Sequence, residues 1–137
     1  MRLEITRKAN LAITVLGTLD QAGTRVSGRD LAEQVGTTTA FLAQVVTPLV
    51  QEGWITSQPG RAGGYEFTAD SDAVSVLDVI EAVEGPTDAA ECVMRTGACS
   101  ASDPCATHEA WSRARDALLA ELAGTPVSVL SPRKVEQ

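Results

Sequence analysis

The chain has 137 residues, of which 44% are hydrophobic, so it is long enough for one domain with a hydrophobic core. Its formal net charge of −7 opposes non-specific attraction to nucleic acid, so any DNA contact must use a locally basic or neutral face. No apolar run approaches the roughly 18 residues of a membrane span, and Met1–Glu4 lacks a signal-peptide pattern. We therefore expect a cytoplasmic protein without a membrane partner.

The first part of the chain predicts three helices. Residues 8–22 are dense in Leu, Ile, Val and Ala, which indicates a largely buried helix that a glycine then ends. A short second helix follows Ser27, whose hydroxyl is placed to cap it, and Gly36 turns the chain. Thr37 or Thr38 then caps a third helix. Two helices around a tight glycine turn suggest a helix-turn-helix motif.

Two short strands follow this motif. Trp54–Ser57 and Tyr65–Thr68 flank a turn that contains three glycines and carries Arg61 at its tip. A hairpin directly after a helix-turn-helix is typical of a wing, and the alternative is an ordinary hairpin with a solvated arginine. The predicted fold is mainly α with a small β-hairpin wing.

The last part of the chain predicts two more helices and a loop between them. Apolar residues at 76–83 indicate a fourth helix, which Gly85 and Pro86 end. Residues 107–123 carry an apolar stripe through Trp111 and Leu118, which packs either within the chain or on the same helix of a second subunit. The predicted parts are a winged helix-turn-helix DNA-binding domain (1–85), a loop (86–106), a dimerisation helix (107–123), and a tail (124–137) that is flexible or docked on the partner.

All the cysteines and the only histidine lie within seventeen residues, as Cys92, Cys99, Cys105 and His108. These soft or borderline donors make a complete ligand set for one transition-metal centre. An odd number of cysteines in a reducing compartment argues against a disulfide framework. The alternative is three scattered free thiols and a surface histidine. Few large apolar residues surround the four donors, so a bound metal would organise this segment.

The order of helix, helix-turn-helix, glycine-rich wing, three cysteines and long helix resembles the IscR/NsrR-like family of bacterial winged-helix iron–sulfur transcriptional regulators. The resemblance covers residues 1 to about 123, and its most specific segments are Met1–Leu3, Gly60–Tyr65, Val76–Ile80 and Cys105–Trp111. It implies a homodimer that binds palindromic double-stranded DNA, usually as a repressor, and responds to redox state, nitric oxide or cluster availability. The ligands of a [2Fe-2S] cluster implied by the resemblance are Cys92, Cys99, Cys105 and His108.

Some members of this family instead hold a [4Fe-4S] cluster with a carboxylate from the first helix of the other subunit. The matching position here is Asn10, and an amide is a poor ligand for iron, so this departure favours His108. Glu4 is a carboxylate nearby in sequence and remains an alternative fourth ligand.

The resemblance also implies which residues face DNA. We expect the third helix to lie in the major groove and the wing arginine to enter the minor groove, through Thr38, Thr39, Ala40, Gln44 and Arg61. Thr38 and Thr39 have helix capping as an alternative role. Arg2, Arg7 and Lys8 either add phosphate contacts or form a solvated basic end. Pro48 departs from the family pattern, and we expect it to kink or shorten the third helix.

Two other functions fit parts of the sequence. A Cys3His set also holds structural zinc, which would give a winged-helix regulator without a cluster. The centre would also serve a small iron–sulfur electron or cluster carrier that does not bind DNA. We do not expect an enzyme, because the chain carries no Ser-His-Asp, phosphate-loop or dinucleotide pattern.

Overall fold

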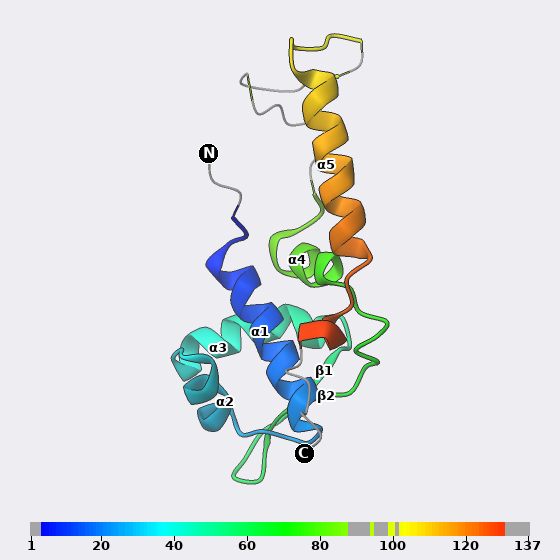
Figure 1. Ribbon diagram of the computed structural model, residues 1–137. Helices are drawn as coiled ribbons and strands as arrows, with labels where there is room; N and C mark the ends of the chain where they lie inside the picture. Colours follow the sequence, from blue (N-terminus) through cyan, green and yellow to red (C-terminus); the bar gives the residue numbers. More distant parts are fainter. Residues whose placement is uncertain (1–3, 88–93, 95–98, 101, 131–137) are drawn as a thin grey trace.

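In the described part of the chain, four helices, a hairpin and a short 3-10 helix pack together, and one further helix projects from them (Figure 1). We call the packed part the body. The computed structural model describes residues 4–87, 94, 99–100 and 102–130. The predicted fold class, mainly α with a hairpin wing, is confirmed. In chain order the elements are α1 (Arg7–Ala22), α2 (Gly28–Val35), α3 (Thr39–Gln51), β1 (Ile55–Gln58), β2 (Gly64–Phe67), α4 (Val76–Glu84), α5 (His108–Ala123) and η1 (Val127–Leu130).

Side-chain caps fix where the helices of the body begin. In each of them a hydroxyl accepts a hydrogen bond from a backbone N–H three residues further on, with Thr6, Ser27, Thr38 and Ser75 as the capping residues of α1, α2, α3 and α4. Glycines with positive φ end α1 at Gly23 and α2 at Gly36. The prediction of Ser27 as a cap is confirmed, and of the two residues predicted for α3, Thr37 or Thr38, the cap is Thr38.

Helix α1 forms the centre of the body and contacts α2, α3, α4 and η1. Leu16 of α1, Leu31 of α2 and Leu42 of α3 are at most 1% exposed. Burial of each such leucine contributes about 1.5 to 3 kcal/mol relative to an exposed position. This core holds α3 against α1 and leaves Thr39, Ala40 and Gln44 exposed on the outer face of α3.

After α5 the chain returns to the body. The Val127 N–H donates to the Val74 carbonyl at 2.8 Å, and the Val76 N–H donates to the Thr125 carbonyl at 2.8 Å. Val127 is fully buried in the core around α1. The stretch from Thr125 to Leu130, predicted to be a flexible or partner-docked tail, therefore packs on its own chain. Residues 131–137 of that tail lie outside the described residues.

The wing is tied to the body by a third extended segment. Strands β1 and β2 pair antiparallel, with Ile55 opposite Phe67 and Gln58 opposite Gly64. Val26, just before α2, exchanges two backbone hydrogen bonds with Tyr65 of β2, at 2.8 and 2.9 Å. The hairpin is therefore fixed relative to the helix-turn-helix.

Gly64 is the position where this junction tolerates no side chain. Its φ is +144°, and a Cβ there would lie 2.1 Å from the Val26 carbonyl oxygen. We expect Gly64→Ala to lower the free energy of unfolding by at least about 2 kcal/mol, measured by urea denaturation followed by circular dichroism.

Gly60→Ala is the matched control for this substitution. Gly60 also has a positive φ, of +99°, but nothing lies within 4 Å of the point that an added Cβ would occupy. Its cost is therefore backbone strain alone, about 1 kcal/mol. Equal losses in the two variants would contradict the steric role of the contact between Gly64 and Val26.

Helix α5 projects from the body, and residues 102–107, which include Cys105, lie at its far end (Figure 1). Near its C-terminal end Leu122 packs beside a small cluster of Ala9, Val76 and Ile80. No residue of α5 is buried, and Leu118 is 51% exposed. Among the described residues, no helix combines the length and apolar character that crossing a membrane requires.

Candidate functional site

Cys99 and His108 face each other where the loop meets the start of α5. The Cys99 sulfur lies 3.2 Å from His108 Nδ1, and it accepts a hydrogen bond from the Cys105 N–H at 3.3 Å. Cys99 is buried, with 8% of its surface exposed. Two of the predicted ligands are thus in direct contact, and the backbone of a third points at the same sulfur.

The start of α5 differs from those of the other helices. Thr107 occupies the N-cap position of α5 but makes no side-chain capping bond. Its hydroxyl instead lies 3.7 Å from the Cys105 sulfur. A helix N-terminus carries partial positive charge, which favours thiolates beside it. At the start of α5 the hydroxyl of the N-cap residue thus contacts the Cys105 sulfur, whereas in the other α-helices the equivalent hydroxyl accepts a backbone N–H.

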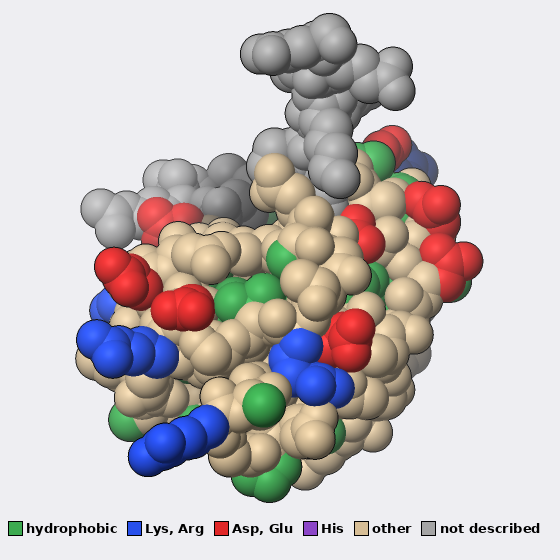
Figure 2. Space-filling model, turned by 90° about the horizontal axis from the view of Figure 1, so that it is seen from below, with side chains coloured by type: hydrophobic (Ala, Val, Ile, Leu, Met, Phe, Trp, Pro, Cys, Tyr) green, Lys and Arg blue, Asp and Glu red, His purple; other side chains and the backbone are tan. Residues whose placement is uncertain are grey.

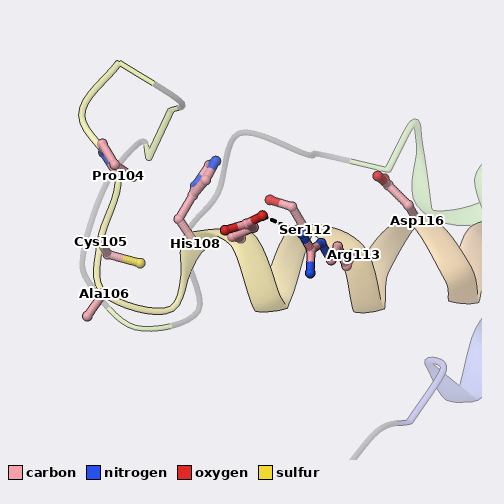
Figure 3. Close-up of a pocket in the computed structure, with 8 residues that line it drawn as sticks. Pro104, Cys105, Ala106, His108, Ser112, Arg113 and Asp116 are labelled. Carbon is pink, nitrogen blue, oxygen red and sulfur yellow. Dashed lines mark hydrogen bonds and ion pairs between the residues drawn. The ribbon is translucent and has the colours of Figure 1, made fainter.

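A pocket of about 510 Å³ opens beside this cluster along the polar face of α5. Figure 3 shows the Cys105 sulfur pointing from the loop toward the helix start, where His108 stands. An ion pair between Arg113 and Glu109 spans the helical side of the pocket. Its lining consists of Pro104, Cys105, Ala106, His108, Glu109, Ser112, Arg113 and Asp116.

Cys99 and His108 fit a metal centre in their chemistry and in their separation. A sulfur and an imidazole nitrogen bound to one tetrahedral metal are separated by roughly 3.5 Å, given bond lengths of about 2.3 and 2.0 Å. The observed 3.2 Å between Cys99 and His108 is within a few tenths of that separation. Cys92 lies outside the described residues, and the described residues alone contain no group of three or more His, Cys, Asp or Glu arranged to hold a metal.

The alternative fourth ligands lie elsewhere in the fold. Asn10 is an exposed residue of α1, and its backbone carbonyl accepts a hydrogen bond from the Thr14 hydroxyl at 2.9 Å. Glu4 is exposed and precedes α1. Neither residue lines the pocket of Cys105 and His108 within one chain.

The outer face of α3 presents the residues predicted to read DNA. Thr39, Ala40 and Gln44 are exposed, as is Thr38. The Thr38 hydroxyl accepts from the Phe41 N–H at 3.1 Å, so this side chain is engaged as the cap of α3. Pro48 does not end the helix, which continues for three residues beyond it to Gln51.

The wing carries an exposed cation. Arg61 is exposed in the turn between β1 and β2. Seen from below (Figure 2), most of the Lys and Arg side chains stand on the left-hand and lower part of the face, with Asp and Glu side chains beside them at the left and near the centre, and further Asp and Glu side chains lie towards the right-hand edge. Basic side chains are therefore present on this face although the net charge of the chain is −7.

Sequence reasoning missed the polar half of the pocket. Glu109, Ser112, Arg113 and Asp116 share one side of α5 with spacings of three and four residues. That periodicity is present in the sequence, but the apolar stripe of the same helix is the more conspicuous signal. The contact between Arg7 and Phe41 is tertiary and had no signal in the sequence.

A helix-turn-helix with a tethered wing and an exposed reading helix defines a winged-helix DNA-binding protein. The Rrf2 family model, described as an iron-dependent transcriptional regulator, matches residues 5–132. The chain therefore belongs to the Rrf2 family of transcriptional regulators. The HTH-type transcriptional regulator IscR of Escherichia coli K12 is 32% identical to it over 120 residues, which are 85% of this chain and 72% of that protein.

Solved structures share the fold. CymR of Staphylococcus aureus has a TM-score of 0.74 and 27% identity, and covers 96% of this chain and 100% of its own. CymR of B. subtilis, named the global cysteine regulator, has a TM-score of 0.78 and 26% identity, with 94% and 97% covered. T. potens IscR has a TM-score of 0.72 at 21% identity, with 93% and 86% covered, which is a likeness of fold alone. The prediction of a DNA-binding regulator rather than an enzyme is confirmed by the family.

Proposed function

We propose that this transcriptional regulator senses redox state, nitric oxide or cluster availability through an iron–sulfur centre, and acts as a cytoplasmic, homodimeric repressor. The observation that carries the proposal is the 3.2 Å contact between the Cys99 sulfur and His108 Nδ1 at the uncapped start of α5. The match to a family described as iron-dependent supports the choice of iron.

The ligands in this proposal are Cys92, Cys99, Cys105 and His108. An imidazole in place of a fourth thiolate removes negative charge from the centre, which raises its reduction potential. The proposed cluster is of the [2Fe-2S] type, as the resemblance of the Cys105–Trp111 motif implies. When bound, such a cluster supplies one-electron redox chemistry and reactivity towards nitric oxide. The chain's own part is to hold the donors, since the Cys105 N–H steadies the Cys99 sulfur and the buried position of Cys99 restricts water.

The proposed dimer uses α5. Its apolar stripe is exposed at Leu118 and half-buried at Trp111 within one chain, and a second copy related by two-fold symmetry would cover both. A two-fold dimer presents two copies of α3 and suits palindromic DNA. Gln44 and Thr39 then face base edges in the major groove, and Arg61 enters the minor groove.

Regulation follows as a population shift between dimers that bind DNA and dimers that do not. A bias of about 2 to 3 kcal/mol is enough to change DNA occupancy by roughly two orders of magnitude. The segment between α4 and α5 contains candidate ligands and is continuous in the chain with α4 of the body and with α5. Binding or loss of the cluster would therefore affect both the DNA-binding body and the dimerisation helix.

Purification without oxygen tests the proposal. We expect a brown protein that contains about equimolar iron and acid-labile sulfide. Its visible spectrum should change on addition of nitric oxide or an oxidant. A colourless protein that contains zinc would establish the structural alternative, because zinc(II) absorbs no visible light. A protein without iron or sulfide, even after reconstitution, would refute cluster sensing. A coloured protein that fails to bind its own promoter would be a carrier rather than a regulator.

The wing arginine gives a separate prediction. Arg61→Ala should weaken binding to the promoter by roughly tenfold and make the salt dependence of affinity shallower, because one phosphate-neutralising charge is lost from each wing. Fluorescence anisotropy at several salt concentrations measures both quantities. Identical salt slopes for the variant and the parent would show that the wing tip does not contact DNA.

A further inference from the structure

The first residue of α1 lies against the first turn of α3. The Arg7 guanidinium carbon is 5.9 Å from the centre of the Phe41 ring. These two side chains and the turn before α3 line a hollow of about 290 Å³. A cation from a different helix is therefore held beside the end of α3 at which Thr39 and Ala40 face outward.

The charge of Arg7 is available to an anion. Among the described residues, no carboxylate lies within 4.0 Å of its guanidinium. Arg25 is paired with Glu66 at 3.9 Å, and Arg113 is paired with Glu109. In a chain with a net charge of −7, an exposed cation next to the reading helix is a strong local determinant of where DNA can approach.

Two elements of the body fix the position of Arg7. The preceding residue, Thr6, caps α1, and its N–H donates to the Glu84 carboxylate at 3.2 Å. Glu84 is the last residue of α4, which leads into the segment with the candidate ligands. The backbone beside Arg7 is thus attached to α4, while its side chain lies on Phe41 of α3.

We propose that Arg7 binds a DNA backbone phosphate beside the start of α3, with Phe41 and Glu84 as its positioning residues. A planar guanidinium presents paired N–H donors that match two phosphate oxygens. Phosphate contacts set the register of a protein on the duplex and carry no sequence information. This inference rests on the DNA binding in the proposed function, but it does not require the iron–sulfur cluster.

The test compares two duplexes of equal length, one from the promoter of the protein's own gene and one unrelated. Arg7→Ala should weaken binding to both duplexes by the same factor, roughly tenfold. The slope of log affinity against log salt should fall by about 1 for each bound Arg7. Arg7→Gln removes the charge but keeps most of the side chain, and it should lower the affinity and the salt slope as Arg7→Ala does. Agreement between the two variants shows that the loss does not come from impaired folding.

Lys8→Ala is the matched control, because it removes the same charge one position further along α1. Lys8 points about 100° away around the helix, and its loss should change affinity less than about twofold. Equal effects of the two substitutions would overturn the inference in favour of a net-charge effect.

The positioning residues have their own readout. Phe41→Leu and Glu84→Ala should each weaken DNA binding when Arg7 is present. Each should have little further effect when combined with Arg7→Ala. Glu84→Gln keeps an oxygen that accepts the Thr6 N–H and should restore the affinity of the parent. Additive losses would show that neither residue acts through Arg7.

The outcomes separate this inference from the proposed function. If the parent binds its promoter and Arg7→Ala binds equally well with the same salt slope, only the role of Arg7 is overturned. A loss confined to the promoter duplex would also overturn it, since base reading would then replace phosphate binding. A parent protein that binds neither duplex would overturn both proposals.

Discussion

Cys99→Ala is expected to lower the iron bound per chain by more than about tenfold. Loss of a residue that merely orients a ligand already costs about 10- to 100-fold in metal affinity, and Cys99 is itself a proposed ligand. Its sulfur contacts His108 and accepts the Cys105 N–H, so its removal also deprives two other ligands of their partner. Iron and acid-labile sulfide are measured on protein purified without oxygen, together with the visible spectrum.

Ser102→Ala is the control for this prediction. Ser102 is an exposed residue of the same loop and offers no sulfur or imidazole. It should retain the iron content of the parent. Stoichiometric iron in Cys99→Ala would refute the ligand assignment, whereas iron loss in both variants would point to a damaged loop.

His108→Ala should have a milder effect than Cys99→Ala. His108 is the first residue of α5, and its removal leaves the apolar stripe of that helix unchanged. We expect a dimer that still takes up iron but has a changed visible spectrum and redox midpoint, because a water or another donor replaces a neutral ligand. An unchanged spectrum and midpoint would remove His108 from the ligand set.

The sequence predicted the features of the fold that depend on local chemistry. Ser27 was identifiable as a cap, and the cap of α3 was narrowed to Thr37 or Thr38, because a hydroxyl before an apolar-periodic stretch satisfies free N–H groups. The wing followed from its three glycines and flanking strands. Such signals are contained within a few neighbouring residues, so no knowledge of the tertiary structure was needed.

Features that depend on distant residues could not be predicted in this way. Val127 lies in a stretch with little periodicity, and its burial depends on the return of the chain to the segment around Val74. The contact of Arg7 with Phe41 joins residues 34 positions apart. Pro48 has a local signal, but packing of Leu49 into the core holds the helix beyond it.

The candidate site was predicted as a set of residues but not as a geometry. Clustering of four donors on the chain indicated a metal centre, and the contact of Cys99 with His108 supports this prediction. The spacing of five residues between Cys99 and Cys105 does not by itself specify that the Cys105 N–H points at the Cys99 sulfur. Loop geometry of this kind depends on the few turns that glycine, serine and proline allow in three dimensions.

Leu118→Glu should convert the proposed dimer into a folded monomer. Leu118 is 51% exposed in the single chain, so the change should alter the free energy of unfolding by no more than about 0.5 kcal/mol. In a two-fold interface the same substitution brings two carboxylates into an apolar seam without partners, at a cost of several kcal/mol. Sedimentation at micromolar concentration gives the mass, and circular dichroism gives the helix content.

DNA affinity should fall with the loss of the dimer. Two linked copies of α3 bind a palindrome with an avidity that can exceed a single copy by about 100-fold or more, and the monomer loses this advantage. Ala120→Glu adds the same charge about 200° around α5 from Leu118, on the side away from the stripe, and should remain a dimer with the affinity of the parent. If Leu118→Glu sediments as a dimer, the apolar stripe of α5 is not the interface, and the two copies must associate through a different surface.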